Sequence, residues 1–298
     1  LPTEVHITPV PSLLSWVSDS NLMIFLPIIA YWIPSLLFHL IDKYDLFSKY
    51  RLHTPEELLK RNHVTMREVI KDVCLQQVLQ MVVGWLLSLS EGQEMTGHEE
   101  VEIIGMLHNY MKVESAFVSL LAVTGVNSWA LVNKLDKAVS FDWRLKLVES
   151  IYHYAIPLLR LWVAVFFLDT WQYFWHRTMH TVPWLYRTFH SRHHRLYVPY
   201  AFGALYNHPF EGLLMDTFGA GIGFKLAGLT QRQGLYFFTF GTLKTIDDHC
   251  GYKIPWDPFQ FLFANNAAYH DIHHQGWGIK TNFSQPFFIC WDRWLSTQ

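Results

Sequence analysis

Histidines grouped at short, regular spacings are the residues of this chain best suited to chemistry. His176 and His180 are four residues apart, which places them on one face of a helix, one turn apart. Two more groups read His-x-x-His-His, a spacing at which the first and fourth residues again share a face. Of 17 histidines, ten lie in this part of the chain: His176, His180, His190, His193, His194, His208, His249, His270, His273 and His274.

The number and type of these side chains restrict the metal that they could bind. Structural zinc sites use four ligands and catalytic ones three, so ten imidazoles suit two ions better than one. The three cysteines, Cys74, Cys250 and Cys290, lie far apart and outside these groups, which argues against iron–sulfur and cysteine-rich zinc sites. The His-Glu-x-x-His pattern of zinc peptidases is absent. Ligation by imidazole alone leaves zinc chemically open, although zinc has no redox chemistry.

Apolar segments are expected to hold these histidines at a membrane. The chain is 51% hydrophobic and 16% charged, against roughly a quarter charged in ordinary soluble proteins. Residues 21–41 carry no formal charge, and at about 1.5 Å per residue they can cross a ~30 Å hydrocarbon core. Further spans are expected at residues 73–90 and 151–175, followed by a hairpin of residues 211–229 and 233–246. Residues 116–132 are predicted to form an interfacial or re-entrant helix.

We therefore expect an all-α integral membrane protein with four to five transmembrane helices and a cytosolic, helical, histidine-rich catalytic cap. No linker or repeat divides the chain, which is predicted to be a single membrane domain. Within it, residues 1–150 would supply N-terminal membrane helices and loops, and residues 151–298 the catalytic region. A net charge of −2 gives no electrostatic reason to expect a nucleic-acid partner.

Loop charges predict the orientation of this domain. The connection between the first two expected spans is strongly basic, which is typical of cytoplasmic loops. Counting spans from there places all the histidine groups on the cytosolic side. Asn282 begins an N-glycosylation acceptor pattern, and this topology predicts that it is unmodified. The basic residues are Lys43, Lys49, Arg51, Lys60, Arg61, Arg67 and Lys71.

Five blocks of sequence resemble the fatty acid hydroxylase and sterol desaturase superfamily. They are HRTMH, HSRHH, ALYNHPFEG, DDHCGYKIPWDP and YHDIHH, all within residues 170–294. The ALYNHPFEG and DDHCGYKIPWDP blocks are most similar to those of fungal sphinganine carbon-4 hydroxylases. Carbon-4 methyl sterol oxidases share similar blocks, so a sterol oxidase or a lipid desaturase with the same metal site is the alternative.

The resemblance implies a non-haem diiron oxygenase at the cytosolic face of the endoplasmic reticulum membrane. Its substrate would be a long-chain sphingoid lipid, sphinganine or dihydroceramide, hydroxylated at carbon 4 by dioxygen. Electrons would come from NADPH or NADH through a reductase, often by way of cytochrome b5. All ten histidines would be ligands of two iron ions, which zinc can replace in purified protein. No catalytic residue beyond the metal ligands is predicted.

One position departs from the pattern of related lipid hydroxylases. They carry a further histidine four residues before the one matching His249, where this chain has Thr245. We predict that His208 supplies the missing ligand. Four carboxylates stand beside ligands in the sequence and are expected to orient imidazole N–H groups. They are Asp169, Asp247, Asp248 and Asp271.

Two other classes of protein are compatible with a histidine-rich membrane protein. A zinc-dependent membrane hydrolase would need no dioxygen, so an anaerobic assay distinguishes it from an oxygenase. A metal transporter would place its polar ligands near the bilayer midplane. Here the histidine groups follow the apolar segments instead, which favours the oxygenase.

Overall fold

The computed structural model describes residues 5–139 and 142–298. Their contacts divide the chain into two compact units, and each unit combines segments from different parts of the sequence. The first contains residues up to 11 together with residues 92–160. The second contains residues 12–91 and 161–298, and it holds all ten candidate histidines.

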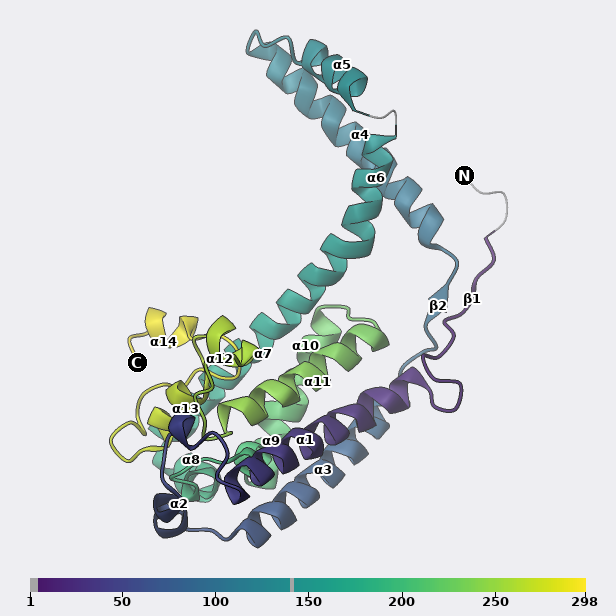
Figure 1. Ribbon diagram of the computed structural model, residues 1–298. Coiled ribbons are helices and arrows are strands. Elements are labelled where there is room, and N and C mark those ends of the chain that lie inside the picture. The colour runs from purple at the N-terminus through teal and green to yellow at the C-terminus, as the bar shows by residue number, and fades with distance from the viewer. Residues whose placement is uncertain (1–4, 140–141) are drawn as a thin grey trace. The chain divides into compact units, whose positions relative to one another are not determined.

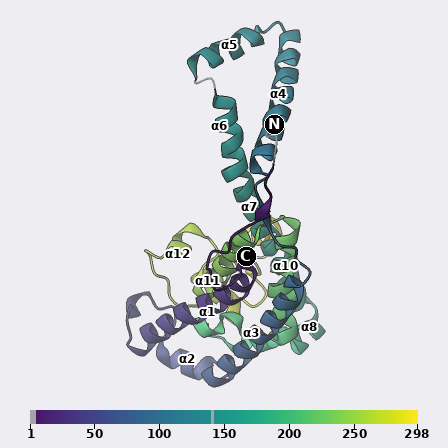
Figure 2. The ribbon, with the colours of Figure 1, turned by 90° about the vertical axis from the view of Figure 1, so that its right-hand side faces the viewer.

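The first unit is built from helices and one short strand pair. Arg144 joins its helices, because the guanidinium contacts the carboxylates of Glu114 at 2.7 Å and Asp136 at 2.6 Å. Figure 2 shows the three α-helices that these residues connect. The elements are β1 (Thr8–Pro9), β2 (Met95–Thr96), α4 (Glu99–Val123), α5 (Ser128–Ala138), α6 (Trp143–Ser150) and the π-helix η2 (Ile151–Ala155).

Residues 116–132, predicted as an interfacial or re-entrant helix, are divided between the end of α4 and the start of α5. Helix α4 ends at Val123, and Gly125 then takes a left-handed backbone conformation with φ of +83°. The side chain of Asn127 next accepts a hydrogen bond from the Ala130 N–H at 3.2 Å and so caps α5. A residue with positive φ followed by a capping asparagine ends one helix and begins another.

Long helices dominate the second unit, and Figure 1 shows α1, α3 and α11 within it. Helix α3 begins at a capping box, in which Thr65 and Glu68 satisfy each other's backbone N–H groups. Helix α11 begins in the same way at Thr230 and Gln233. The long elements are α1 (Asp19–Lys43), α3 (Met66–Ser88), α7 (Ile156–Thr181, in this unit from residue 161) and α11 (Gln231–Asp248).

Three helices of the described residues are long and apolar enough to cross a membrane. They are Asp19–Lys43, Met66–Ser88 and Trp143–Thr181, the last running through α6, η2 and α7. They correspond to the spans predicted at residues 21–41, 73–90 and 151–175. The chain is therefore a mostly helical, multi-pass membrane protein.

The segment predicted as the first arm of a hairpin is helical from residue 209 to residue 226 and contains a π-helical stretch. Residues 211–229 are divided among α9 (Pro209–Gly212), the π-helix η5 (Leu213–Phe218) and α10 (Gly219–Leu226). A turn with positive φ at Gly228 then leads to α11. Phe224 of α10 packs against Phe237 and Phe238 of α11. None of these elements meets the length and hydropathy of a span among the described residues.

The histidines lie at the ends of the long helices α7 and α11 and on short elements between the long helices. A buried cluster ties these short elements to the long helices: Tyr31 of α1 donates a hydrogen bond to the Phe202 carbonyl at 2.7 Å. Val69 and Val73 of α3 are fully buried in the same cluster, and such burial contributes roughly 1.5–3 kcal/mol per side chain. The short elements are η1 (Ser48–Tyr50), α2 (Pro55–Arg61), α8 (Pro183–Thr188), η3 (His190–Arg195), η4 (Ala201–Leu205), α12 (Pro258–Leu262), α13 (Ala267–His274) and α14 (Cys290–Trp294).

Candidate metal centre

Nine of the ten candidate histidines come together in two groups. In each group, one ligand atom per residue lies within 4.8 Å of all the others. We call them the five-histidine group and the four-histidine group. The five-histidine group is His176, His180, His190, His194 and His273; the four-histidine group is His193, His249, His270 and His274.

Two short elements, η3 and α13, each contribute histidines to both groups. In the 3₁₀ helix η3, His193 belongs to the four-histidine group while its neighbour His194 belongs to the five-histidine group. In α13, His273 faces the five-histidine group, and His274 faces the other. The rings of His194 and His274 have centroids 5.0 Å apart. The two groups are therefore adjacent and share the same supports.

Backbone carbonyls fix the orientation of most of these imidazoles. When a carbonyl accepts the Nδ1–H, the ring is held in one tautomer and its Nε2 lone pair is left to bind a metal. His176 hydrogen bonds in this way to the Phe283 carbonyl at 2.8 Å. Four further pairs are His193 with Tyr206 at 3.0 Å, His249 with Thr245 at 2.8 Å, His273 with Thr281 at 2.7 Å and His274 with Leu196 at 2.7 Å.

Nε2 atoms within each group lie close together, as the ligand atoms of one metal ion do. The Nε2 atoms of His190 and His180 are 2.8 Å apart, and those of His270 and His249 are 3.0 Å apart. The Nε2 atoms of His176 and His273 are buried without a hydrogen-bond partner among the described residues. Adjacent ligands on an octahedral ion with bonds of roughly 2.1 Å lie about 3.0 Å apart. The donor set therefore fits two metal ions, one in each group.

Burial keeps the histidines in the neutral form that binds metals. It lowers the pKa of His193 from 6.5 to about 4 and that of His249 to about 3. The pKa values of His190, His194, His270, His273 and His274 are lowered further by burial and by the neighbouring imidazoles. At neutral pH these rings carry no charge, and their lone pairs are available to a metal.

The structure does not bring His208 together with the other nine histidines. Its Nδ1 accepts a hydrogen bond from the Phe210 N–H at 3.2 Å, so the side chain caps helix α9. Its ring also packs against Phe189, with centroids 4.9 Å apart. Thr245, at the position where related lipid hydroxylases have a histidine, contributes its carbonyl to His249.

The four predicted carboxylates have partners other than the ligand imidazoles among the described residues. Asp169 accepts hydrogen bonds from two backbone N–H groups of the loop before α14. Asp247 accepts from Gln260, Asp248 pairs with Lys244, and Asp271 contacts His53 at 2.8 Å. Asp271 and Asp169 thus connect the loops and helices around the site and do not orient individual imidazole rings.

Glu211 has the role that was predicted for the aspartates. Its Oε1 lies 2.5 Å from the Nδ1 of His190, and the side chain is 2% exposed. A carboxylate that accepts the N–H of a ligand imidazole fixes the ring and raises its basicity. Sequence reasoning missed this residue, although it stands in the Asn-His-Pro-Phe-Glu block that carried the resemblance.

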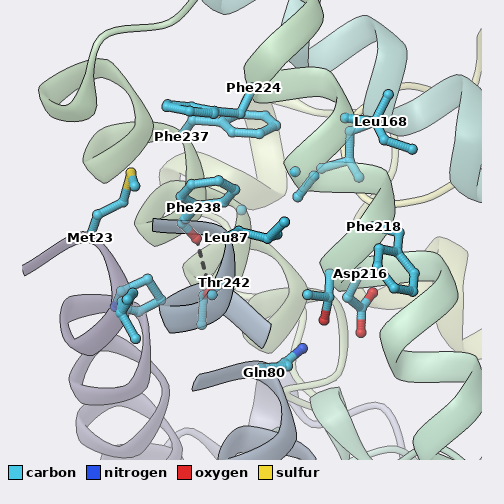
Figure 3. A pocket seen from close by; sticks show the side chains of 18 of the residues that line it. Met23, Gln80, Leu87, Leu168, Asp216, Phe218, Phe224, Phe237, Phe238 and Thr242 are labelled. Carbon is cyan, nitrogen blue, oxygen red and sulfur yellow. Dashed lines mark hydrogen bonds between the residues drawn. The ribbon is translucent and has the colours of Figure 1, made fainter. Parts of the chain in front are cut away.

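A large apolar cavity leads to the histidines. Its volume is about 490 Å³, within the roughly 300–1,000 Å³ of small-molecule sites. Figure 3 shows the rings of Phe224, Phe237 and Phe238 on its wall, with the polar ends of Gln80 and Asp216 in another part. Helices α1, α3, α7, α10 and α11 and the π-helix η5 all contribute to its lining.

A second, smaller cavity of about 30 Å³ connects the apolar cavity with the metal centre. Its wall includes His190, His193, His249 and His270 from the two histidine groups. Four residues line both cavities and mark the junction: Gln172, Asp216, Thr245 and Pro286. The large apolar cavity therefore ends beside the metal centre.

Comparisons with known proteins agree with this site. The family model "Fatty acid hydroxylase" matches residues 161–297. The chain is 44% identical to the sphingolipid C4-hydroxylase of Saccharomyces cerevisiae, over 98% of this chain and 76% of that protein. It is 42% identical to sphinganine C4-monooxygenase 1 of Arabidopsis thaliana, over 94% of this chain and 88% of that protein.

A methylsterol monooxygenase of Aspergillus fumigatus is more distant, 28% identical over 66% of this chain and 70% of its own length. No solved structure matches the chain. The identities over nearly the whole chain and the family match at the histidine groups lead to one conclusion. The chain belongs to the fatty acid hydroxylase family.

Proposed function

We propose that this protein is a membrane monooxygenase that hydroxylates a sphingoid long-chain base, sphinganine or its N-acyl form, at carbon 4. The names of its full-length relatives support the reaction and the substrate. One structural observation carries the proposal: two adjacent histidine groups lie at the end of an apolar cavity. The distant relation to a methylsterol monooxygenase makes sterol oxidation the lesser alternative.

The nine grouped histidines are the proposed ligands of two iron ions, with His208 left as a helix cap. Iron bound there supplies the redox chemistry that activates dioxygen. The donor set supports this because imidazole suits iron and because each group offers more nitrogens than a catalytic zinc site uses. Electrons would come from NADPH or NADH through a reductase, with cytochrome b5 as the intermediate carrier.

The protein's own part is to position carbon 4 and to exclude water. Carbonyls and Glu211 hold the imidazoles in one tautomer, so little reorganisation is needed when substrate binds. The walls of the large cavity bury the alkyl tail, which gains roughly 0.8 kcal/mol for each buried CH₂ group. Which carbon reacts would depend on how far the polar head lies from the metal centre.

We further propose that the site faces the cytosol at the endoplasmic reticulum membrane. The basic loop between α1 and α3 supports this orientation. The absence of a glycan on Asn282 would not support it, because this side chain is 4% exposed and its amide donates to the Tyr269 carbonyl at 3.0 Å. An acceptor sequence introduced at the exposed Trp277 tests the orientation better, since a glycan there would place the site in the lumen.

The proposed activity is tested by product analysis. Purified iron-loaded protein is incubated with reductase, NADPH, dioxygen and either sphinganine or a 4-methyl sterol, and products are identified by mass. We expect 4-hydroxysphinganine and no sterol oxidation. Oxidation of the sterol without 4-hydroxysphinganine would move the assignment to a sterol oxidase.

A further inference from the structure

Three carboxylates line the small cavity beside the metal centre: Glu211, Asp216 and Asp248. Two of them have a partner that compensates their negative charge. Asp248 forms an ion pair with the buried ammonium of Lys244, and Glu211 accepts from His190, a proposed ligand of a metal cation. Asp216 has neither kind of partner.

Asp216 lies where the polar cavity meets the apolar one. Its Oδ1 accepts a hydrogen bond from the Gln172 Nε2 at 3.0 Å, and it lines both cavities. Figure 3 shows Asp216 on the wall of the large cavity. No Lys, Arg or His of residues 5–139 and 142–298 forms an ion pair with it. Lys225, which lines the same large cavity, is paired with Glu91 at 2.7 Å.

Burial raises the pKa of Asp216 to about 7, so a cation supplied by the ligand would stabilise its charged form. Withdrawing a charge from water into apolar surroundings is costly unless an opposite charge or strong hydrogen bonds compensate it. One amide N–H from Gln172 compensates only part of that cost. The remaining oxygen is available to a ligand that brings a positive charge and N–H donors.

We infer that Asp216, oriented by Gln172, binds the protonated amine of a free long-chain base and thereby selects the free base over its N-acyl form. This inference rests on the proposed function. In sphinganine the amine nitrogen is three bonds from carbon 4, so a carboxylate lining the small cavity can hold the amine while carbon 4 faces the histidines. N-acylation removes the positive charge and two of the three N–H donors, which leaves Asp216 uncompensated.

The first experiment compares ligands on wild-type protein and needs no turnover. Thermal unfolding of the iron-loaded protein in detergent is followed with octadecylamine or octadecanol, which differ only in the polar group. We expect the amine to bind at least about tenfold more tightly than the alcohol, as charge-assisted hydrogen bonds predict. Equal stabilisation by both compounds would overturn the inference, whatever reaction the enzyme performs.

The second experiment uses Asp216→Asn, which keeps the shape of the side chain and removes its charge. Turnover is measured with sphinganine and with an analogue that has a hydroxyl in place of the amine, alongside bound metal. We expect kcat/KM for sphinganine to fall by about 10- to 100-fold, mainly through KM, with metal content and turnover of the analogue nearly unchanged. The matched control is Asp257→Asn. Both Asp and Asn at this position can accept a hydrogen bond from the Phe259 N–H and so cap α12.

The outcomes separate the inference from the function on which it rests. If Asp216→Asn keeps the wild-type preference for amine over hydroxyl, Asp216 does not bind the amine. Preferential hydroxylation of N-acylsphinganine by wild-type protein would also overturn the inference while leaving carbon-4 hydroxylation intact. If wild-type protein hydroxylates neither compound, the proposed function fails, and the binding of amine and alcohol by wild-type protein and Asp216→Asn still decides whether Asp216 recognises amines. If Asp216→Asn does not fold, equal binding of amine and alcohol by wild-type protein still overturns the inference.

Discussion

His193 and His194 are consecutive residues, yet they belong to different histidine groups, with ring centroids 5.5 Å apart. The short 3₁₀ helix η3 turns one ring to each side. His273 and His274 repeat this relationship in α13, with ring centroids 6.0 Å apart. Because two separate elements each supply both groups, the two proposed metal ions must lie side by side, as in two-metal sites generally.

Substitutions in the two groups should each remove metal and activity. We expect His193→Ala, in the four-histidine group, and His273→Ala, in the five-histidine group, to abolish hydroxylation and to lower the metal bound per chain. Elemental analysis of the purified variants measures this. The control is His208→Asn, which keeps a side chain able to cap α9 and should retain the wild-type metal content. If His208→Asn loses metal while His193→Ala and His273→Ala keep it, His208 is a ligand and the grouped histidines are not.

Glu211 should control how tightly the metal is held. In Glu211→Gln an oxygen can still accept from His190, but the charge that strengthens this hydrogen bond is lost. We expect a metal affinity about 10- to 100-fold lower, as for other groups that orient metal ligands. Metal retention during titration with a chelator measures the affinity, and the exposed Glu56→Gln is the control. Unchanged retention in Glu211→Gln would show that the carboxylate is not needed.

Metal-free protein should lose stability as the pH falls. The pKa of His193 is lowered to about 4 and that of His249 to about 3, whereas an unfolded chain titrates near 6.5. Between these values the unfolded state binds more protons, so the free energy of unfolding decreases as the pH drops from about 6.5 towards 4. Denaturation of metal-free protein at about pH 7.5 and pH 5 measures the effect. An equal or higher midpoint at the lower pH would contradict it.

Filling the apolar cavity should change the preferred chain length. Gly241 of α11 lines this cavity, and a Cβ added there would meet no atom within 4 Å. We therefore expect Gly241→Leu to fold and to slow turnover of sphinganine more than that of a base with a shorter tail. Gly105→Leu is the control, since Gly105 is exposed on α4 and has similar room for a Cβ. If Gly241→Leu treats both chain lengths as wild type does, the tail binds elsewhere.

Much of the fold and site could be predicted because apolar length and histidine spacing are local properties. Hydropathy located α1, α3 and the span ending in α7, and the spacing of His190, His193 and His194 pointed to side chains that the structure brings together with other histidines. Spacing did not show that neighbours divide between two groups. That division depends on the 3₁₀ geometry of η3 and on where α13 packs.

The partners of the ligands could not be predicted in the same way. Five imidazoles donate to backbone carbonyls, such as those of Phe283 and Leu196. Every residue has a backbone carbonyl, so the type of a residue does not show that its carbonyl accepts from a histidine. The aspartates next to ligands in sequence were chosen for their proximity along the chain. On a helix, however, neighbours such as Asp248 and His249 point in different directions. The π-helix η5 within residues 211–229 was likewise not predicted from the sequence.

The origin of the inserted oxygen tests the central claim most directly. Iron-loaded protein is supplied with sphinganine, reductase, NADPH and ¹⁸O₂ in ordinary water, and the product is fragmented in a mass spectrometer to locate the label. We predict one ¹⁸O atom per product molecule, on carbon 4, and no product from zinc-loaded protein, because zinc has no redox chemistry. A 4-hydroxy product with its oxygen from water, or equal turnover with zinc, would contradict the assignment of a dioxygen-dependent, iron-containing centre.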